Sequence, residues 1–147
     1  PAETLLDIGI GDGETIATMK GFWGDPFVDG CDVSDEPKNE MLKNYEFEKE
    51  SYDRSSYFDR EFDVITSFDS LACWMKSEGS AILTRMEEKA KKLIVIWTPD
   101  GMYPYGMFRS CWHAEDFLER GFCVYKAKDI HQGPPMVASG LLAWKVK

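Results

Sequence analysis

The feature that most constrains this chain is a cluster of alternating glycines at the end of an apolar run. The run is Thr4 to Ile10 (TLLDIGI), and the glycines are Gly9, Gly11 and Gly13. Glycine adopts backbone conformations that other residues avoid, so the cluster predicts a sharp turn where a strand ends. Residues 14–20 then have the composition of a helix. The segment therefore predicts a strand, a tight loop whose backbone can approach a ligand, and a helix.

Strand and helix continue to alternate along the chain. A second strand is expected at residues 27–33, followed by a helix at about 37–44 that Ser34 and Asp35 can cap. Further strands are expected where apolar and β-branched residues gather, and further helices where apolar residues recur at helical spacing. The expected strands are 45–50, 62–68 and 93–98, and the expected helices are 78–92 and 114–120, with Gly121 as C-cap.

The chain ends with two strands that should pair with each other, at residues 122–130 and 141–146. The connection between them carries Gly133, Pro134 and Pro135 and leaves no room for a crossover helix. Strands joined in this way pair antiparallel. The sequence therefore predicts an α/β fold with a mostly parallel sheet and an antiparallel hairpin at the C-terminus.

The composition limits the class of protein. A chain of 147 residues with 44% hydrophobic residues is expected to form one domain, over residues 1–147. Seventeen basic and 26 acidic residues give a net charge of −9, which disfavours nucleic acid as a partner. The apolar runs are far shorter than the roughly 20 residues of a membrane span, and no secretory signal is visible. The four cysteines form no CxxC pair, so we expect reduced thiols in a cytoplasmic protein and no metal.

The spacing of the glycines separates this loop from two other glycine-rich ligand loops. The dinucleotide fingerprint GxGxxG needs a glycine at position 14, where this chain has Glu14. A phosphate-binding P-loop ends in Gly-Lys-Ser/Thr, which is absent, and Asp7 would repel a nearby phosphate. The pattern of an acid followed by xGxGxG therefore disfavours both dinucleotide binding and nucleotide hydrolysis.

The same pattern resembles the first motif of the class I S-adenosylmethionine-dependent methyltransferases. Asp7, Gly9, Gly11 and Gly13 match all four positions of that motif. The resemblance covers nearly the whole chain, because VDGCDVS looks like the family's second strand, EFDVITSFDSL like its fourth and KKLIVIWTPDG like its fifth. It implies a Rossmann-like three-layer sandwich with a seven-stranded sheet, S-adenosylmethionine as cofactor, and methyl transfer.

The resemblance also implies which residues outside the glycine loop contact the cofactor. Asp32, with Val33 beside it, occupies the position of the acid that grips the ribose hydroxyls, about 20 residues after the glycine loop. Phe68 and Asp69 follow the fourth strand, at the edge where open α/β sheets bind ligands. Near the adenine, where many members carry an acid, the count falls on Ser51. Capping of the next helix is the alternative role for Asp32.

Two departures from the family pattern bear on activity. The Asn/Asp-Pro-Pro-Tyr motif of methyltransferases that act on nucleic-acid bases is absent after the fourth strand, in agreement with the acidic charge. The N-terminal helices that cover the cofactor in this family are expected to be missing before Pro1. No pattern in the sequence indicates a catalytic base.

The loop after the fifth strand is the expected site of the methyl acceptor. It lies at the ligand edge of the sheet and is rich in glycine, proline and aromatic residues. Part of it, TPDG…RSCWHAEDFLERGF, resembles a loop of small-molecule members of the family. The candidate acceptor-binding residues are Tyr103, Tyr105, Arg109 and His113. Packing is the alternative role for the aromatic residues, Trp112 included, and hydrogen bonding at the start of the next helix is the alternative for His113.

The sequence thus predicts a methyltransferase that acts on a small-molecule acceptor. A non-catalytic S-adenosylmethionine-binding or partner module with the same fold is the first alternative, favoured by Ser51 and by the missing N-terminal helices. A dinucleotide oxidoreductase is the second, disfavoured by Glu14. No pattern indicates the acceptor atom or the oligomeric state.

Overall fold

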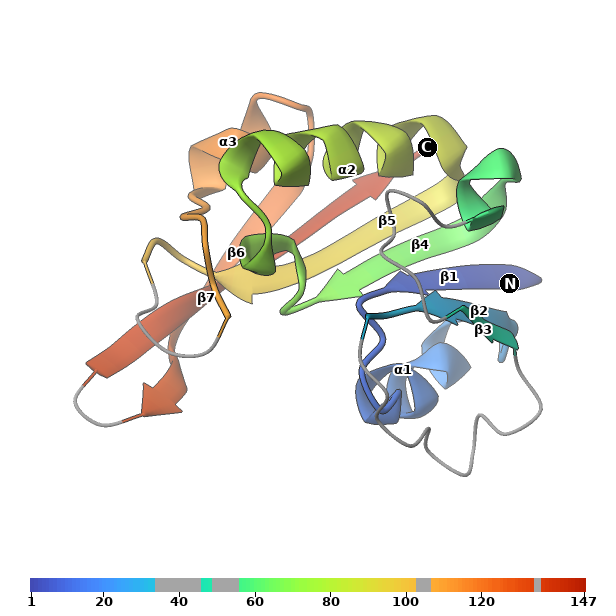
Figure 1. Cartoon of the computed structure of the whole chain (residues 1–147), viewed down its shortest axis with the longest axis horizontal. Helices are drawn as coiled ribbons and strands as arrows, with labels where there is room; N and C mark the ends of the chain where they lie inside the picture. Colours follow the sequence, from blue (N-terminus) through green and yellow to red (C-terminus); the bar gives the residue numbers. More distant parts are fainter. Residues whose placement is uncertain (34–45, 49–55, 103–106, 134–135) are drawn as a thin grey trace.

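The computed structural model describes residues 1–33, 46–48, 56–102, 107–133 and 136–147. Figure 1 shows one twisted sheet with helices on both faces. Seven strands form the sheet in the order β3-β2-β1-β4-β5-β7-β6. The strands are β1 (Thr4–Ile8), β2 (Phe27–Cys31), β3 (Glu46–Glu48), β4 (Phe62–Phe68), β5 (Ala90–Pro99), β6 (Cys123–Gly133) and β7 (Met136–Val146).

The sheet is mixed. Strands β3, β2, β1, β4 and β5 pair parallel with their neighbours, whereas β7 pairs antiparallel with both β5 and β6. The predicted α/β fold and the predicted antiparallel C-terminal hairpin are therefore confirmed. Because β1 lies between β2 and β4, the loops that follow these three strands meet at the carboxyl edge of the sheet.

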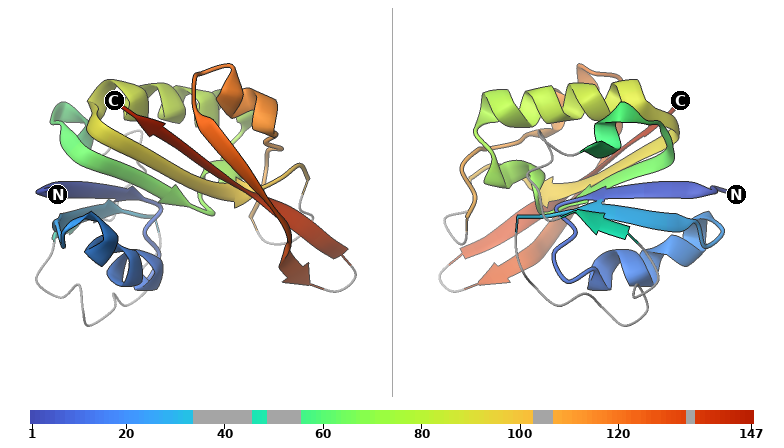
Figure 2. Two further views of the ribbon diagram at one scale, coloured as in Figure 1. Left: turned by 180° about the vertical axis from the view of Figure 1, so that it is seen from behind. Right: turned by 45° about the vertical axis from the view of Figure 1, so that its right-hand side comes forward.

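The sheet separates the apolar core into two layers, and each layer packs against helices. The α-helices are α1 (Glu14–Met19), α2 (Lys76–Lys89) and α3 (Ala114–Leu118), and the short 3₁₀ helices are η1 (Lys20–Trp23), η3 (Ser56–Asp59) and η4 (Leu71–Cys73). Successive residues of β1 point to opposite faces, so Leu5 packs in the core with α1 while Leu6 packs in the core with α2 and α3. Figure 2 shows α1 on one face of the sheet and α2 and α3 on the other.

The boundary between α2 and β5 differs from the prediction. The sequence predicts a helix at 78–92 and a strand at 93–98, but α2 ends at Lys89 and β5 begins at Ala90. Ala90 pairs with Phe62 of β4, so backbone hydrogen bonding in the sheet replaces the last helical turn. At its other end α2 begins at Lys76, where the Met75 N–H donates to Glu78 Oε2 at 3.0 Å. Such a bond satisfies a backbone group that the helix leaves unpaired.

The C-terminal hairpin is longer than the prediction of 122–130 and 141–146. Strand pairing continues to Gly133 and Met136, with a register shift between Ala127 and His131. The last pair between β7 and β5 is Gly140 with Pro99, and the Asp100 N–H donates to the Ser139 carbonyl, so residues 136–138 of β7 extend past β5 and pair with β6. The two strands satisfy each other's backbone groups there, which allows the hairpin to extend beyond the sheet (Figure 2).

The remaining differences are small. Strand β2 ends at Cys31 instead of residue 33, and α1 continues as the 3₁₀ helix η1. Strand β3 occupies residues 46–48 of the predicted 45–50, and residues 45, 49 and 50 lie outside the described residues. Helix α3 ends at Leu118, and Gly121 follows with φ 79°, the left-handed conformation of a C-cap glycine. The predicted helix at 37–44 lies outside the described residues. Within the described part of the chain, none of the helices has the length and apolar character to span a membrane.

Candidate functional site at the carboxyl edge of the sheet

The glycine loop turns sharply at the end of β1. Gly9, Gly11 and Gly13 have φ values of 75°, 55° and 81°, a region that costs other L-residues roughly 1–2 kcal/mol each. The N–H groups of Gly9 and Ile10 both donate to the carbonyl of Cys31, at 2.9 and 3.3 Å. The alternating glycines are therefore required by the backbone, and the loop is bonded to the end of β2.

Gly9 also lacks a side chain because the segment after β4 lies against it. A Cβ at Gly9 would overlap the side chain of Ser70. The Ser70 hydroxyl donates to the Ile8 carbonyl at 2.7 Å and lies 2.8 Å from the Ser67 hydroxyl. Ser70 is not among the residues that the sequence predicts for the site. The only indication in the sequence is that Ser70 carries a hydroxyl group and follows the fourth strand, whose end lies opposite the glycine loop in a parallel sheet.

Asp32 connects the end of β2 to the same loop. Its Oδ2 accepts a hydrogen bond of 2.7 Å from the N–H of Gly11. This contact is neither of the two roles that the sequence suggested, and the helix that Asp32 could cap lies outside the described residues. Val33, next in the chain, is 59% exposed. Asp32 thus holds the glycine loop in its conformation and lies at the exposed edge of the sheet.

Asp7 is buried at the end of β1. Its Oδ1 accepts a hydrogen bond of 2.6 Å from the hydroxyl of Thr66 on β4. Burial, which penalises the ionised form, raises the pKa of Asp7 to about 7. The Thr66 hydrogen bond opposes this rise, and the negative charge of Asp32 adds to it. Asp7 and Asp32 are therefore close enough to interact electrostatically.

The end of β4 supplies the next two predicted residues. Phe68 is partly buried against the core that contains α1. Asp69 is exposed and has φ 54°, in the left-handed region, while its N–H donates to the carbonyl of Trp97 at 2.8 Å. Non-glycine residues held in this conformation are uncommon and cluster at functional sites. The strained turn places Asp69 on the same sheet edge as Asp32.

Cys73 and Arg109 show how the segments around this edge converge. Burial raises the pKa of the Cys73 thiol, the charges of Asp69 and Asp32 raise it further, and the charge of Arg109 lowers it. The backbone N–H of Arg109 donates to the carbonyl of Ala72 at 2.7 Å, which fixes the chain after β5 against η4. The structure therefore brings Arg109 to the edge that carries Asp32 and Asp69. No sequence signal pointed to Cys73.

Of the other predicted residues, three are not described and His113 contacts different residues. Ser51, Tyr103 and Tyr105 lie outside the described residues. The His113 N–H donates to Asp116 Oδ2 at 2.8 Å, so the backbone of His113 has the helix-start role that was its alternative. Its imidazole is exposed, with Nδ1 3.4 Å from Asp100 Oδ1. Trp112 is buried in the core, as the packing alternative predicts.

Solved structures of several methyltransferases share the fold of this chain. No family model matches the sequence, and no curated protein matches it. Among solved structures, a magnesium protoporphyrin IX methyltransferase from Synechocystis PCC 6803 with bound S-adenosylmethionine is 15% identical, with a TM-score of 0.66 over 100% of this chain and 71% of that one. A methyltransferase from Archaeoglobus fulgidus, named as dependent on S-adenosylmethionine, is 16% identical, with a TM-score of 0.66 over 97% of this chain and 86% of that one.

A third similar structure is the plantazolicin methyltransferase BpumL in complex with S-adenosylhomocysteine. It is 14% identical, with a TM-score of 0.68 over 99% of this chain and 76% of that one. Identities at this level support conclusions about the fold alone. This chain has the fold of the class I S-adenosylmethionine-dependent methyltransferases.

Proposed function

We propose that this chain binds S-adenosylmethionine at the carboxyl edge of β1, β2 and β4 and transfers its methyl group to a small-molecule acceptor. The observation that carries the proposal is the left-handed glycine loop whose Gly11 N–H is held by Asp32 at 2.7 Å. This arrangement presents backbone and a carboxylate together at the edge where α/β sheets bind ligands. The shared fold of the three methyltransferases supports the same position.

The charges at this edge fit the proposed cofactor. S-adenosylmethionine carries a sulfonium cation and an uncharged adenosine, whereas NAD carries a pyrophosphate. Asp32 raises the pKa of Asp7, and Asp32 and Asp69 raise the pKa of the Cys73 thiol, so the local field is negative. A negative field favours a cationic cofactor and opposes a pyrophosphate. The dinucleotide alternative is accordingly disfavoured by the electrostatics as well as by Glu14.

We propose a role for each residue expected at this edge. Asp32 would accept hydrogen bonds from the ribose hydroxyls, and Val33 and Phe68 would contact the adenine, with Ser51 as a further candidate from the sequence. The backbone of Gly9 to Gly13 and the carboxylate of Asp69 would face the amino-acid part. When bound, the cofactor supplies an electrophilic methyl group on sulfur. The chain contributes by aligning the acceptor with that methyl and by excluding water.

The proposal extends to the setting of the protein. The four cysteines form no CxxC pair, and thiols stay reduced in a reducing cytoplasm. We therefore place the proposed reaction in the cytoplasm. The finding that would contradict this setting is a disulfide between two of these cysteines in protein isolated from cells under conditions that trap thiols.

A thermal-shift experiment tests the binding part of the proposal. S-adenosylhomocysteine should raise the unfolding midpoint and NAD should not, because a ligand that binds only the folded state stabilises it. Gly11→Val should abolish the stabilisation, since valine is strained at φ 55°. Gly21→Val is the matched control, because nothing lies within 4 Å of the Cβ position there. Equal stabilisation by both ligands, or no stabilisation by S-adenosylhomocysteine at millimolar concentration, would contradict the proposal.

The same variants decide between an enzyme and a binding module. Incubation with S-adenosylmethionine and a mixture of small-molecule acceptors should release S-adenosylhomocysteine from the wild type and from Gly21→Val. Gly11→Val should release none. Tight cofactor binding without turnover of any acceptor class would instead favour the non-catalytic module.

A further inference from the structure

We propose that the methyl acceptor is an apolar molecule with a carboxylate group, and that Arg109 binds the carboxylate. The inference rests on the proposed function, because it identifies the substrate class of the same site. It depends on three observations: the hydrogen bonds that hold the Arg109 backbone, a guanidinium that lies outside any ion pair within the described residues, and the exposed methionines of the segments bonded together near it.

The backbone of Arg109 is held firmly against the segment that follows β4. The Ala72 carbonyl accepts hydrogen bonds from the N–H groups of Arg109 and Ser110, at 2.7 and 3.1 Å. The Lys76 ammonium group donates to the carbonyl of Cys111 at 2.7 Å. Residues 109–111 therefore run alongside residues 72–76, and Arg109 projects from a fixed position at the carboxyl edge. A fixed backbone reduces the entropy lost when the side chain binds a ligand.

The guanidinium of Arg109 is exposed and lies outside any ion pair within the described residues. Two other arginines pair with acids, Arg60 with Asp29 at 2.5 Å and Arg120 with Glu87 at 2.8 Å. In a chain with a net charge of −9, an arginine without such a pair at the ligand edge is unusual. The charge of Arg109 lowers the pKa of the Cys73 thiol, which the charges of Asp69 and Asp32 raise. The edge is thus negative near the ends of β2 and β4 and positive on the side of β5.

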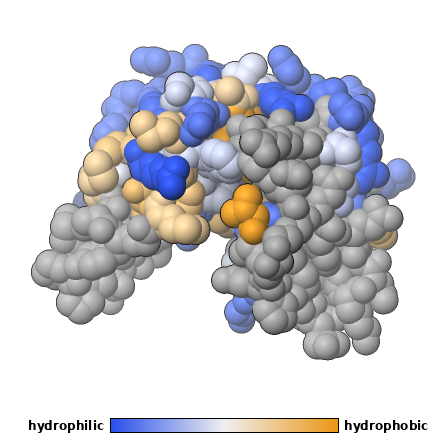
Figure 3. Space-filling view, in the orientation of Figure 1, coloured by the Kyte–Doolittle hydropathy of each residue, from blue (hydrophilic) through white to orange (hydrophobic). Residues whose placement is uncertain are grey.

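Exposed methionines belong to the segments that are hydrogen-bonded together near Arg109. Met75, Met102 and Met107 are 54%, 61% and 73% exposed; Met75 lies shortly after Ala72, Met107 shortly before Arg109, and Met102 follows Gly101, whose N–H donates to the Trp112 carbonyl. Figure 3 shows a pale orange, hydrophobic area on the left of the view. Methionine is flexible and polarisable, and it adapts to apolar ligands of irregular shape. The surface therefore combines an apolar contact area with one guanidinium.

This combination favours a ligand that has an apolar body and a carboxylate group. A planar guanidinium donates two parallel hydrogen bonds to a carboxylate, a geometry that an alcohol or amine does not match. An acceptor without an anion would cover Arg109 and leave its charge unpaired, which costs free energy. The two charges of the complex would also be separated, with the cofactor cation near the acids of β2 and β4 and the acceptor anion near Arg109.

Calorimetric titration with decanoate and decanol tests the inference. The wild type should bind decanoate at least tenfold more tightly than decanol, and hexanoate should bind at least tenfold more weakly than decanoate. Arg109→Gln should weaken decanoate binding at least tenfold and change decanol binding less than threefold. Arg85→Gln is the matched control, because it removes the same charge from α2, and it should change decanoate binding less than threefold. The affinity of Arg109→Lys for decanoate should fall between those of the wild type and Arg109→Gln, since lysine keeps the charge but cannot donate two parallel hydrogen bonds.

Three results would overturn the inference: equal affinity for decanoate and decanol, decanoate binding that is unaffected by Arg109→Gln, or an equal loss in Arg85→Gln. A titration with S-adenosylhomocysteine separates this failure from failure of the proposed function. If S-adenosylhomocysteine binds and decanoate binding ignores Arg109, the inference is wrong and the proposed function stands. If decanoate depends on Arg109 while S-adenosylhomocysteine does not bind, the carboxylate site stands and its assignment to a methyl acceptor is wrong.

Discussion

Asp7 shows how a single buried residue connects the glycine loop to the sheet. Its carboxyl group lies at the end of β1, accepts a hydrogen bond from Thr66 and is 3% exposed. Burial favours the neutral form, which is why its pKa rises to about 7. At neutral pH the residue is therefore poised between its two protonation states.

The first prediction concerns the pH dependence of stability. The folded protein holds an extra proton on Asp7 between its ordinary pKa of 3.8 and about 7, so the free energy of unfolding should fall as pH rises through that window. A tenfold change in proton affinity corresponds to about 1.4 kcal/mol, so the total loss amounts to a few kcal/mol. Urea unfolding from pH 4 to pH 8 measures it. Asp7→Asn imitates the neutral form and should flatten the curve.

Asp63 and Asp116, whose pKa values are also altered, do not account for a loss of stability in this pH window. The pKa values of Asp63 and Asp116 lie below their ordinary range, Asp63 through the Glu3 backbone N–H and two lysines and Asp116 through Lys76 and the His113 backbone. Their stabilisation is lost only as pH falls below about 4, in the opposite direction. An unfolding free energy that rises from pH 4 to pH 7 in the wild type would contradict the role given to Asp7.

The second prediction concerns Asp32. Loss of its carboxylate removes the hydrogen bond to the Gly11 N–H and the proposed bonds to the ribose hydroxyls. Bonds to a charged group contribute about 1.5–3 kcal/mol, so Asp32→Ala should weaken S-adenosylhomocysteine binding at least tenfold. Asp12→Ala removes an exposed carboxylate from the same loop and should change the affinity less than threefold. If both variants bind alike, Asp32 has only a structural role.

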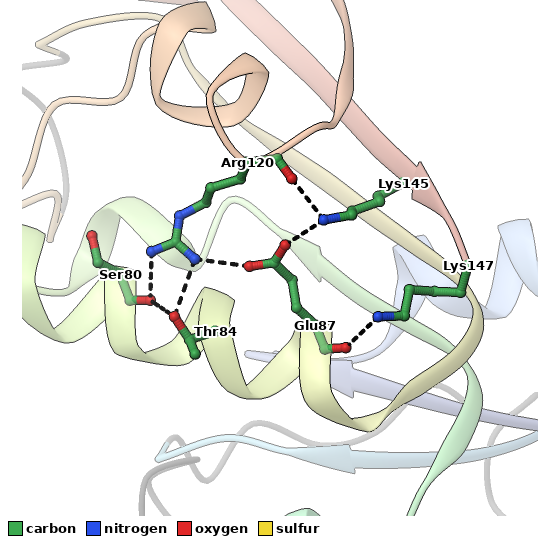
Figure 4. A network of polar contacts seen from close by, with 6 residues as sticks. All are labelled: Ser80, Thr84, Glu87, Arg120, Lys145 and Lys147. Atoms are coloured by element: carbon green, nitrogen blue, oxygen red, sulfur yellow. Dashed lines mark hydrogen bonds and ion pairs between the residues drawn. The ribbon is translucent and has the colours of Figure 1, made fainter.

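At the scale of elements, a polar network holds α2, the end of α3 and β7 together (Figure 4). Glu87 of α2 accepts hydrogen bonds from Arg120 at 2.8 Å and from Lys145 at 2.6 Å. Arg120 also donates to Thr84 and to the carbonyl of Ser80, at 3.1 and 3.2 Å. The three charged side chains are 19–28% exposed, so solvent only partly screens the network.

The third prediction follows from this network. Glu87→Ala leaves two partly buried cations without their carboxylate and should lower the free energy of unfolding by about 1–3 kcal/mol. Glu88→Ala, one position along the same helix at an exposed site, should change it by less than about 0.5 kcal/mol. Chemical denaturation of both variants measures the difference. Similar losses in the two variants would show that helix propensity, rather than the network, accounts for the effect.

At the scale of the whole molecule, the parallel and antiparallel parts of the sheet meet where β5 pairs with β7. Gly140 of β7 pairs with Pro99 at the end of this seam. The indole ring of Trp97 occupies the space that a Cβ at Gly140 would need. The Trp97 ring therefore packs directly against the backbone of β7, beside the strand pairing that joins the hairpin to the sheet.

The fourth prediction tests that seam. Gly140→Ala should lower the free energy of unfolding by about 1–3 kcal/mol, because overpacking forces the tryptophan ring out of its position. Gly21→Ala adds the same methyl group where nothing lies within 4 Å, so it should be neutral or stabilise by up to about 1 kcal/mol. Urea unfolding followed by tryptophan fluorescence measures both. A neutral Gly140→Ala would mean that the ring moves aside at no cost.

What the sequence determined by itself is the parallel half of the fold, the glycine loop and the existence of the hairpin. The strand at residues 62–68 was predicted with the bounds that the structure shows, because an unbroken β-branched run is a local signal. The glycine loop was equally local, since the left-handed φ values at Gly9, Gly11 and Gly13 require glycine whatever surrounds them. The hairpin followed from a short connection between two strands.

What only the tertiary structure decided are contacts between residues far apart in the chain. Ser70 against Gly9, Thr66 on Asp7 and Arg109 beside Ala72 join segments about 40 to 60 positions apart, at distances that depend on strand register. The boundary between α2 and β5 was likewise set by the pairing of Ala90 with Phe62. Local patterns in a sequence determine the conformation of a segment, whereas the partner of a side chain depends on which segments the folded sheet brings together.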